Sequence, residues 1–136
     1  MKTEELRIEA KVEALPEAIA FAVGTLTDDC PMRERMHIEL VTEEIFVNIA
    51  SYAYDPAIGP AEVRCEVLDD PLRVVIQFLD HGKPFDPLAR EDADTSEEAL
   101  MERIGGLGIL LVKETMDEVS YSYEEGKNIL TILKKL

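Results

Sequence analysis

The chain has 136 residues, of which 46% are hydrophobic, and its formal net charge at pH 7 is −15. A chain of this length buries about two-thirds of its unfolded surface, so we expect one globular domain over residues 1–136. The negative charge argues against binding to nucleic acid or to an anionic membrane, because both interactions need basic surfaces. The composition favours small molecules and basic protein surfaces as partners.

Cysteine content and hydropathy predict a cytoplasmic protein. The chain has two cysteines, Cys30 and Cys65, and their spacing fits neither a metal site nor a disulfide framework. No apolar run approaches the length that a membrane-spanning helix needs, and the acidic start at residues 1–5 is unlike a signal peptide. We therefore expect reduced thiols and no membrane association.

The N-terminal half of the chain predicts one strand and two helices. Residues 6–12 alternate apolar and charged side chains, as a half-buried strand does. A helix is expected from residue 15 to about residue 28, with Pro16 in its first turn. A longer helix is expected from residue 32 to about residue 54, and the Asp-Pro pair that follows ends it.

The C-terminal half predicts four strands and one helix. The four strands are expected at residues 61–68, 72–80, 119–123 and 129–133. The Asp-Asp-Pro turn makes the first two antiparallel neighbours, and the last two form a closing hairpin. A loop over residues 82–103 and a helix over residues 109–116 separate the two pairs. This order indicates an α+β two-layer sandwich, in which helices cover one face of a mixed β-sheet.

Asp80 ends the strand predicted over residues 72–80, at a position where ligand-binding residues of α/β sheets collect. Gly82 follows two residues later, and its missing side chain lets a flat ligand approach the backbone. The Asp80 carboxylate can accept a hydrogen bond from an exocyclic amine such as that of adenine, and it rejects a carbonyl oxygen there. An ordinary β-turn has the same Asp-x-Gly sequence, so the interpretation depends on two further segments.

Glu44 and Asn48 are four residues apart on the longer predicted helix, so their side chains lie one turn apart on the same face. A carboxylate and an amide in this arrangement could hold a divalent ion and orient a hydroxyl group. The alternative is an exposed polar stripe, because Glu39 and Glu43 are acidic as well.

Gly105-Gly-Leu-Gly108 directly precedes the helix predicted over residues 109–116. Glycines before a helix N-terminus let backbone N–H groups converge on an anion, to which the helix dipole adds about 0.3–1 kcal/mol of attraction. A flexible hinge without a ligand has the same sequence. The segment lacks the Lys-Ser/Thr of a P-loop, and no strand leads into it, so P-loop and dinucleotide-fingerprint sites are excluded.

Taken in chain order, the three segments resemble the nucleotide-binding boxes of the GHKL (Bergerat-fold, histidine-kinase-like) ATP-binding superfamily. The segments similar to its N, G1 and G2 boxes are Glu44-x-x-x-Asn48, Asp80-x-Gly82 and Gly106-x-Gly108. Within the superfamily, the surrounding sequence is most similar to the anti-sigma-factor serine/threonine kinases of bacteria. The resemblance covers residues 6–136.

The resemblance implies a role for each of these residues. Asp80 would bind the adenine amine, and Gly82 would give the base room. Asn48 would be the Mg²⁺ ligand, and Glu44 the general base. The residues expected at the phosphates are Arg103, Gly105, Gly106 and Gly108. Thr131 on the last strand is expected near the adenine, and residues 83–103 would form the ATP lid.

The implied function is an ATP- and Mg²⁺-dependent kinase that phosphorylates a serine on a STAS-type anti-sigma antagonist. A sigma factor would be its second partner, and family members commonly form homodimers. Two departures leave alternatives open: Tyr52 replaces the family's usual histidine, and the segment 83–103 is acidic, which compensates a triphosphate poorly. The alternatives are a catalytically inactive nucleotide-binding module that sequesters a partner, and a detached catalytic domain of a phosphorelay.

Overall fold

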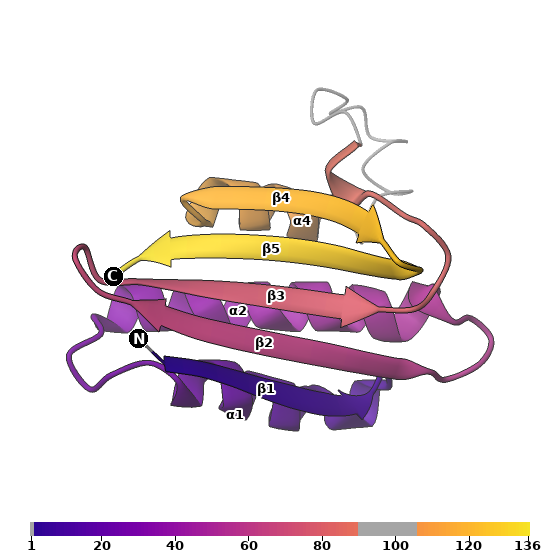
Figure 1. Ribbon diagram of the computed structural model, residues 1–136, viewed down its shortest axis with the longest axis horizontal. Helices are drawn as coiled ribbons and strands as arrows, with labels where there is room; N and C mark the ends of the chain where they lie inside the picture. Colours follow the sequence, from indigo (N-terminus) through magenta and orange to yellow (C-terminus); the bar gives the residue numbers. More distant parts are fainter. Residues whose placement is uncertain (1, 90–105) are drawn as a thin grey trace.

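Five strands form one sheet in the spatial order β1-β2-β3-β5-β4, and every adjacent pair is antiparallel (Figure 1). The computed structural model describes residues 2–89 and 106–136. The strands are β1 (Lys2–Glu9), β2 (Pro60–Leu68), β3 (Arg73–Asp80), β4 (Glu118–Glu124) and β5 (Lys127–Lys135). All five predicted strands are therefore present, with bounds that differ by a few residues.

The prediction that the sheet is mixed is wrong, because every adjacent pair of the described strands is antiparallel. Strands β3 and β4 run in the same direction, because each is antiparallel to β5. Had they paired with each other, the sheet would have been mixed. Instead β5 folds back from β4 and lies between them, so no parallel pair forms among the described strands.

Among the described residues, three helices cover one face of the sheet and lie behind it in Figure 1. They are α1 (Leu15–Gly24), α2 (Met32–Asn48) and α4 (Gly106–Thr115). The α+β two-layer sandwich is thereby confirmed. The short helical segments are η1 (Val12–Ala14), η2 (Ile49–Ala53) and η3 (Pro87–Ala89). The long predicted helix continues past Asn48, but η2 is a π-helix.

Alternation along the strands places one set of side chains in the core between the two layers. The largest buried side chains that face the helices come from the three central strands, and α2 and α4 supply the opposite wall. The core residues from these elements are Val63, Cys65, Val74, Ile76, Phe78, Leu130, Ile132, Ile38, Val41, Ile45 and Val112, and Met116 directly after α4 joins them. Burial of each large aliphatic or aromatic side chain contributes about 1.5–3 kcal/mol, so this interface holds the two layers together.

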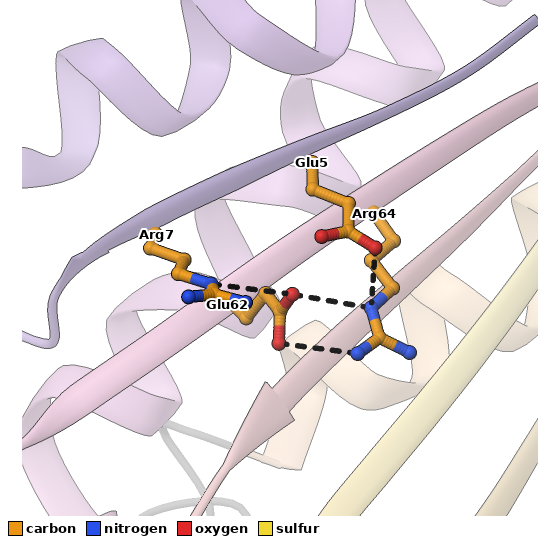
Figure 2. A network of polar contacts seen from close by, with 4 residues as sticks. All are labelled: Glu5, Arg7, Glu62 and Arg64. Atoms are coloured by element: carbon orange, nitrogen blue, oxygen red, sulfur yellow. Dashed lines mark hydrogen bonds and ion pairs between the residues drawn. The ribbon is translucent and has the colours of Figure 1, made fainter.

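The opposite face of the sheet is not covered by these helices and carries charged side chains. On β1 and β2, Arg64 Nε lies 3.2 Å from Glu62 Oε1 and 3.4 Å from Glu5 Oε1, and Arg7 lies 3.9 Å from Glu62 (Figure 2). Ion pairs at a protein surface contribute about 0–1 kcal/mol each, so they add little to stability.

The β4–β5 hairpin closes with a two-residue turn. Glu125 and Gly126 both have positive φ, 52° and 78°. Positive φ at both central positions matches the right-handed twist of the flanking strands, and it sets the register of the hairpin. The separate pairing of β5 with β3 places Asn128, near the start of β5, directly opposite Asp80 at the end of β3.

None of the helices in the described residues combines the length and the apolar character that crossing a membrane requires.

Candidate functional site

A cavity of about 530 Å³ lies between the two layers where β3 ends and β5 begins. Its apolar walls come from both layers: Ile45, Ile49, Phe78, Ile109 and Leu130. The polar residues that line it include Asn48, Asp80, Lys83, Tyr121 and Asn128. The volume lies within the range of about 300–1,000 Å³ that is usual for small-molecule sites. The apolar walls suit a flat ring system, and the polar groups can fix its orientation.

Asp80 is buried, with 5% of its surface exposed. Its Oδ1 atom accepts hydrogen bonds from the backbone N–H of Gly82 at 2.8 Å and from Asn128 Nδ2 at 2.9 Å. Its Oδ2 atom has no hydrogen-bond donor within the described part of the chain. Because Asp80 lines the cavity and a carboxylate oxygen is a hydrogen-bond acceptor, Oδ2 is suited to accept a hydrogen bond from a ligand there.

Asn128 is the central side chain of the polar network beside Asp80, and it is 7% exposed. Its Nδ2 donates to Asp80 Oδ1 and, at 2.8 Å, to the backbone carbonyl of Lys83. Its Oδ1 accepts from the Phe85 N–H at 3.0 Å and from the Tyr121 hydroxyl at 2.5 Å. Burial raises the pKa of Tyr121, which keeps the hydroxyl protonated as a donor.

The sequence interpretation missed Asn128 and Tyr121. Asn128 was assigned to the hairpin turn, one residue before the predicted start of the strand. Its polarity next to an apolar run was a weak signal. The pairing of β5 with β3, which brings it opposite Asp80, cannot be read from the hairpin alone.

Asn48 and Glu44 occupy different positions relative to the cavity. Asn48 is the last residue of α2 and lines the cavity. Glu44 lies one turn earlier, is partly exposed and does not line the cavity. Tyr52, on the π-helical segment η2, lines the cavity with 64% of its surface exposed, so it stands at the opening. The structure thus brings Asn48 and Asp80 to one cavity, and Glu44 is not among the residues that line it.

Gly82 allows the end of β3 to pack directly against η2. A Cβ atom at this position would collide with the backbone carbonyl oxygen of Ala53 and lie within 3.0 Å of two further Ala53 backbone atoms. The space that the glycine leaves is therefore occupied on this side by protein backbone. This close contact holds the residues after Asp80 against the segment that follows Asn48.

Tyr54 makes a second connection at the same junction. Its hydroxyl accepts a hydrogen bond from the His81 N–H at 2.7 Å and donates one to the Pro60 carbonyl at 2.5 Å. Burial raises the pKa of Tyr54, while the hydrogen bond from His81 lowers it, and the net shift is upward. The hydroxyl therefore stays protonated at neutral pH and ties the start of β2 to the end of β3.

The glycine-rich segment begins α4 rather than preceding it. Gly106 is the first residue of α4, three residues before the predicted start at residue 109, and Gly108 is in the first turn. The N–H groups of a first helical turn have no partner within the helix, and Ile109 from this turn lines the cavity. The N-terminus of α4 therefore lies next to the cavity. Arg103 and Gly105 lie outside the described residues.

Thr131, which the sequence places near the adenine, does not line the cavity with Asp80. Thr131 Oγ1 accepts a hydrogen bond from Gln77 Nε2 at 3.3 Å on the face of the sheet that the helices leave uncovered. Its neighbour Leu130 lines the cavity instead. Successive side chains of a strand point to opposite faces, so a shift of one residue moves a side chain out of the site.

Residues 8–134 match the family model of the histidine kinase-like ATPase domain. The serine-protein kinase RsbW of Listeria monocytogenes is 31% identical over 97 residues, which cover 68% of this chain and 61% of the relative. The chain thus spans less than two-thirds of this relative. The serine/threonine-protein kinase BtrW of Bordetella bronchiseptica is 25% identical, with coverage of 96% and 92%. The anti-sigma F factor of Caldanaerobacter subterraneus is also 25% identical, with coverage of 79% and 73%.

The fold matches that of a solved histidine kinase, AdeS of Acinetobacter baumannii. The TM-score is 0.52 at 15% sequence identity, and the match covers 99% of this chain and 68% of the kinase. The family model, the similar kinases and the matching fold agree with the three boxes recognised in the sequence. The chain belongs to the histidine kinase-like ATPase domain family, and its resemblance to the GHKL superfamily is confirmed.

Proposed function

We propose that the chain is an ATP-binding regulatory serine/threonine kinase of the anti-sigma type. The observation that carries this proposal is the buried Asp80, which lines a cavity of nucleoside size with one carboxylate oxygen lacking a donor in the described residues. The 6-amino group of adenine is such a donor, whereas the 6-oxo group of guanine is an acceptor. The apolar walls at Ile49, Phe78 and Leu130 would hold the faces of the base.

The phosphates would extend from the base toward Asn48 and the N-terminus of α4. Backbone N–H groups of the first turn of α4, including Gly106 and Gly108, would donate to phosphate oxygens. Gly105 and Arg103 remain proposed members of this phosphate site. Lys83 is the one lysine or arginine among the described residues that line the cavity, so these residues offer little positive charge there.

Mg²⁺ fits the side chains of this site through Asn48. No group of three or more His, Cys, Asp or Glu residues in the described part of the chain could hold a metal on its own. Mg²⁺ usually keeps several waters and takes few protein ligands when it binds together with phosphates, so one carboxamide oxygen is compatible with this mode. When bound, the ion neutralises charge on the phosphates during transfer.

Glu44 is the proposed general base. It lies on the same helical face as Asn48, one turn away, and it is partly exposed. A substrate serine that approaches from solvent could therefore reach both the terminal phosphate and the Glu44 carboxylate. In this position the carboxylate would accept the hydroxyl proton as the serine oxygen attacks.

The proposed partners follow from the similarity to proteins named serine-protein kinase and anti-sigma F factor. The substrate would be a serine on a STAS-type anti-sigma antagonist, and the second partner a sigma factor. A net charge of −15 suits basic surfaces on these partners. A homodimer in the cytoplasm remains part of the proposal.

A second candidate is a nucleotide-binding module that sequesters a partner without phosphoryl transfer. It is favoured by the position of Glu44, which does not line the cavity. Tyr52 at the opening, in place of the family's usual histidine, favours it too.

The two candidates differ in the effect of Glu44→Gln on transfer. We expect this variant to bind Mg-ATP as wild type does and to phosphorylate a recombinant STAS-type antagonist about 10²–10⁴-fold more slowly, because only the general base is lost. Glu43→Gln, an exposed neighbour on the same helix, is the matched control and should transfer at the wild-type rate. The readout is labelled phosphate on the antagonist and its position by mass spectrometry.

Phosphoserine formed by wild type and lost in Glu44→Gln supports the kinase. ATP-dependent binding of the antagonist without transfer supports the sequestering module. Phosphohistidine as the product contradicts both and indicates a phosphorelay domain.

A further inference from the structure

We propose that Asn128 is a positioning residue that makes Asp80 selective for the 6-amino group of adenine. The inference rests on the proposed function, since it concerns recognition of the nucleotide. It assigns the selectivity to a pair of residues, Asp80 and Asn128, that face each other in the β3–β5 ladder. The partner residue comes from the last strand, far from the three boxes in the sequence.

The orientation of the Asn128 carboxamide is fixed by contacts at both of its ends. Its nitrogen faces acceptors, namely Asp80 Oδ1 and the Lys83 carbonyl, with the Gly82 carbonyl at 3.4 Å. Its oxygen faces donors, the Phe85 N–H and the Tyr121 hydroxyl. A rotated carboxamide would place its oxygen against a carboxylate and carbonyls, and its nitrogen against the Phe85 N–H donor. Because the side chain is buried, no solvent would compensate these contacts.

This fixed donor determines how the two oxygens of Asp80 are used. Asn128 Nδ2 and the Gly82 N–H both bind Oδ1, which leaves Oδ2 as the oxygen available to the cavity. Without Asn128, the Asp80 carboxylate would keep only the hydrogen bond from the Gly82 N–H, and the orientation of its plane would no longer be fixed. A hydrogen bond to the ligand requires a defined direction of the acceptor, so the loss should fall on the ligand group that Oδ2 contacts.

The same geometry allows a purely structural role, which is the competing interpretation. Asn128 also holds the backbone at Lys83 and Phe85, and both residues line the cavity. If that support were its whole contribution, its removal would deform the wall of the cavity and weaken every nucleotide equally. The two interpretations therefore differ in whether the effect depends on the 6-amino group.

The test compares Mg-ATP with the Mg complex of purine riboside triphosphate, which is ATP without the 6-amino group. Dissociation constants are measured by calorimetry for wild type, Asn128→Ala and Tyr121→Phe. Thr131→Val is the matched control, because it lies on the same strand but on the uncovered face. For Asn128→Ala we expect ATP to bind about 10–100-fold more weakly, the usual value of a hydrogen bond to a charged group, while the analogue changes little. Thr131→Val should change neither constant.

Tyr121→Phe removes one of the two donors to the Asn128 oxygen and keeps the ring. We expect a smaller loss of affinity, about threefold to tenfold in the dissociation constant, and again only for ATP. If Asn128→Ala does not fold, as judged by circular dichroism, this variant decides the question. Equal weakening of both ligands in the folded variants, or no weakening, overturns the inference. Wild type that binds both ligands equally, or neither, overturns the proposed adenine site itself, and this failure is recognised without any variant.

Discussion

At the scale of single residues, the thiol of Cys65 has a strongly raised pKa. Its side chain faces the core from β2 with 1% of its surface exposed. Burial raises the pKa of the thiol to about 12 from an ordinary value of 9.0, because the thiolate loses its hydration. The folded protein therefore keeps this proton at pH values where the unfolded chain releases it.

This shift predicts a loss of stability at alkaline pH. The contribution of Cys65 is fully present below pH 9 and declines as the pH rises from 9 toward about 12. In this interval the free energy of unfolding falls by at most about 1.4 kcal/mol per pH unit from this group. Urea denaturation at a series of pH values, on wild type and Cys65→Ala, checks the prediction. The variant should be less stable near neutrality but lose stability less steeply above pH 9, and equal slopes would contradict the assignment.

At the scale of elements, the site depends on a tight junction between η2 and the end of β3. Gly82 lies against the Ala53 backbone, and Tyr54 bonds to His81 and Pro60. These contacts fix the chain directly after Asp80 and directly after Asn48. A π-helical turn at the end of an α-helix is rare and is often found at functional sites, and here it carries Tyr52 to the opening of the cavity.

The junction predicts that Gly82→Ala is destabilising. The added Cβ collides with backbone atoms of Ala53, which cannot move aside as a flexible side chain could, so we expect a loss of about 1–3 kcal/mol in the free energy of unfolding. Gly24→Ala is the control, because a Cβ there meets nothing within 4 Å. At the end of α1 it should be neutral or stabilise by up to about 1 kcal/mol. Chemical denaturation of both variants measures the difference, and equal effects would rule out the close contact.

The elements were largely predictable from the sequence because each has its own local signal. Alternating apolar and polar residues predicted the strands, and Pro16 predicted the start of α1. The residues between the last two strands predicted the β4–β5 turn. The place of β5 between β3 and β4 was not predictable, because strand order depends on long-range packing. The spacing of apolar residues along the sequence also could not reveal that the helix ending at Asn48 continues as a π-helix.

The candidate site was predictable to the extent that its residues occur in recognisable boxes. Asp80 and Asn48 were found in this way, and both line the cavity. Asn128 was missed, and Thr131 does not line the cavity, for the same physical reason. Both lie on β5, where the register against β3 decides which side chains face the cavity, and that register follows from a pairing between distant segments.

At the scale of the whole molecule, the two layers form the cavity jointly. The sheet supplies Asp80, Asn128 and Leu130, and the helical layer supplies Asn48 and Ile109. A ligand bound there would contact both layers, so it should stabilise the folded state as a whole. The chain carries a net charge of −15, and we expect a nucleotide to bind with Mg²⁺, which reduces repulsion of its phosphates.

The most direct test of the adenine site is thermal unfolding of wild type and Asp80→Asn with Mg-ADP, Mg-ATP and Mg-GTP. Ligand at about 100 times its dissociation constant stabilises by about 2.7 kcal/mol, which raises Tm by roughly 6–15 °C. We predict this rise for wild type with both adenine nucleotides and not with GTP. Asp80→Asn should lose it, because the Gly82 N–H and Asn128 Nδ2 donors hold the amide oxygen at the Oδ1 position and the amide N–H₂ then faces the amine of the base. An equal rise in the variant, an equal rise with GTP, or no rise with any nucleotide would contradict the account.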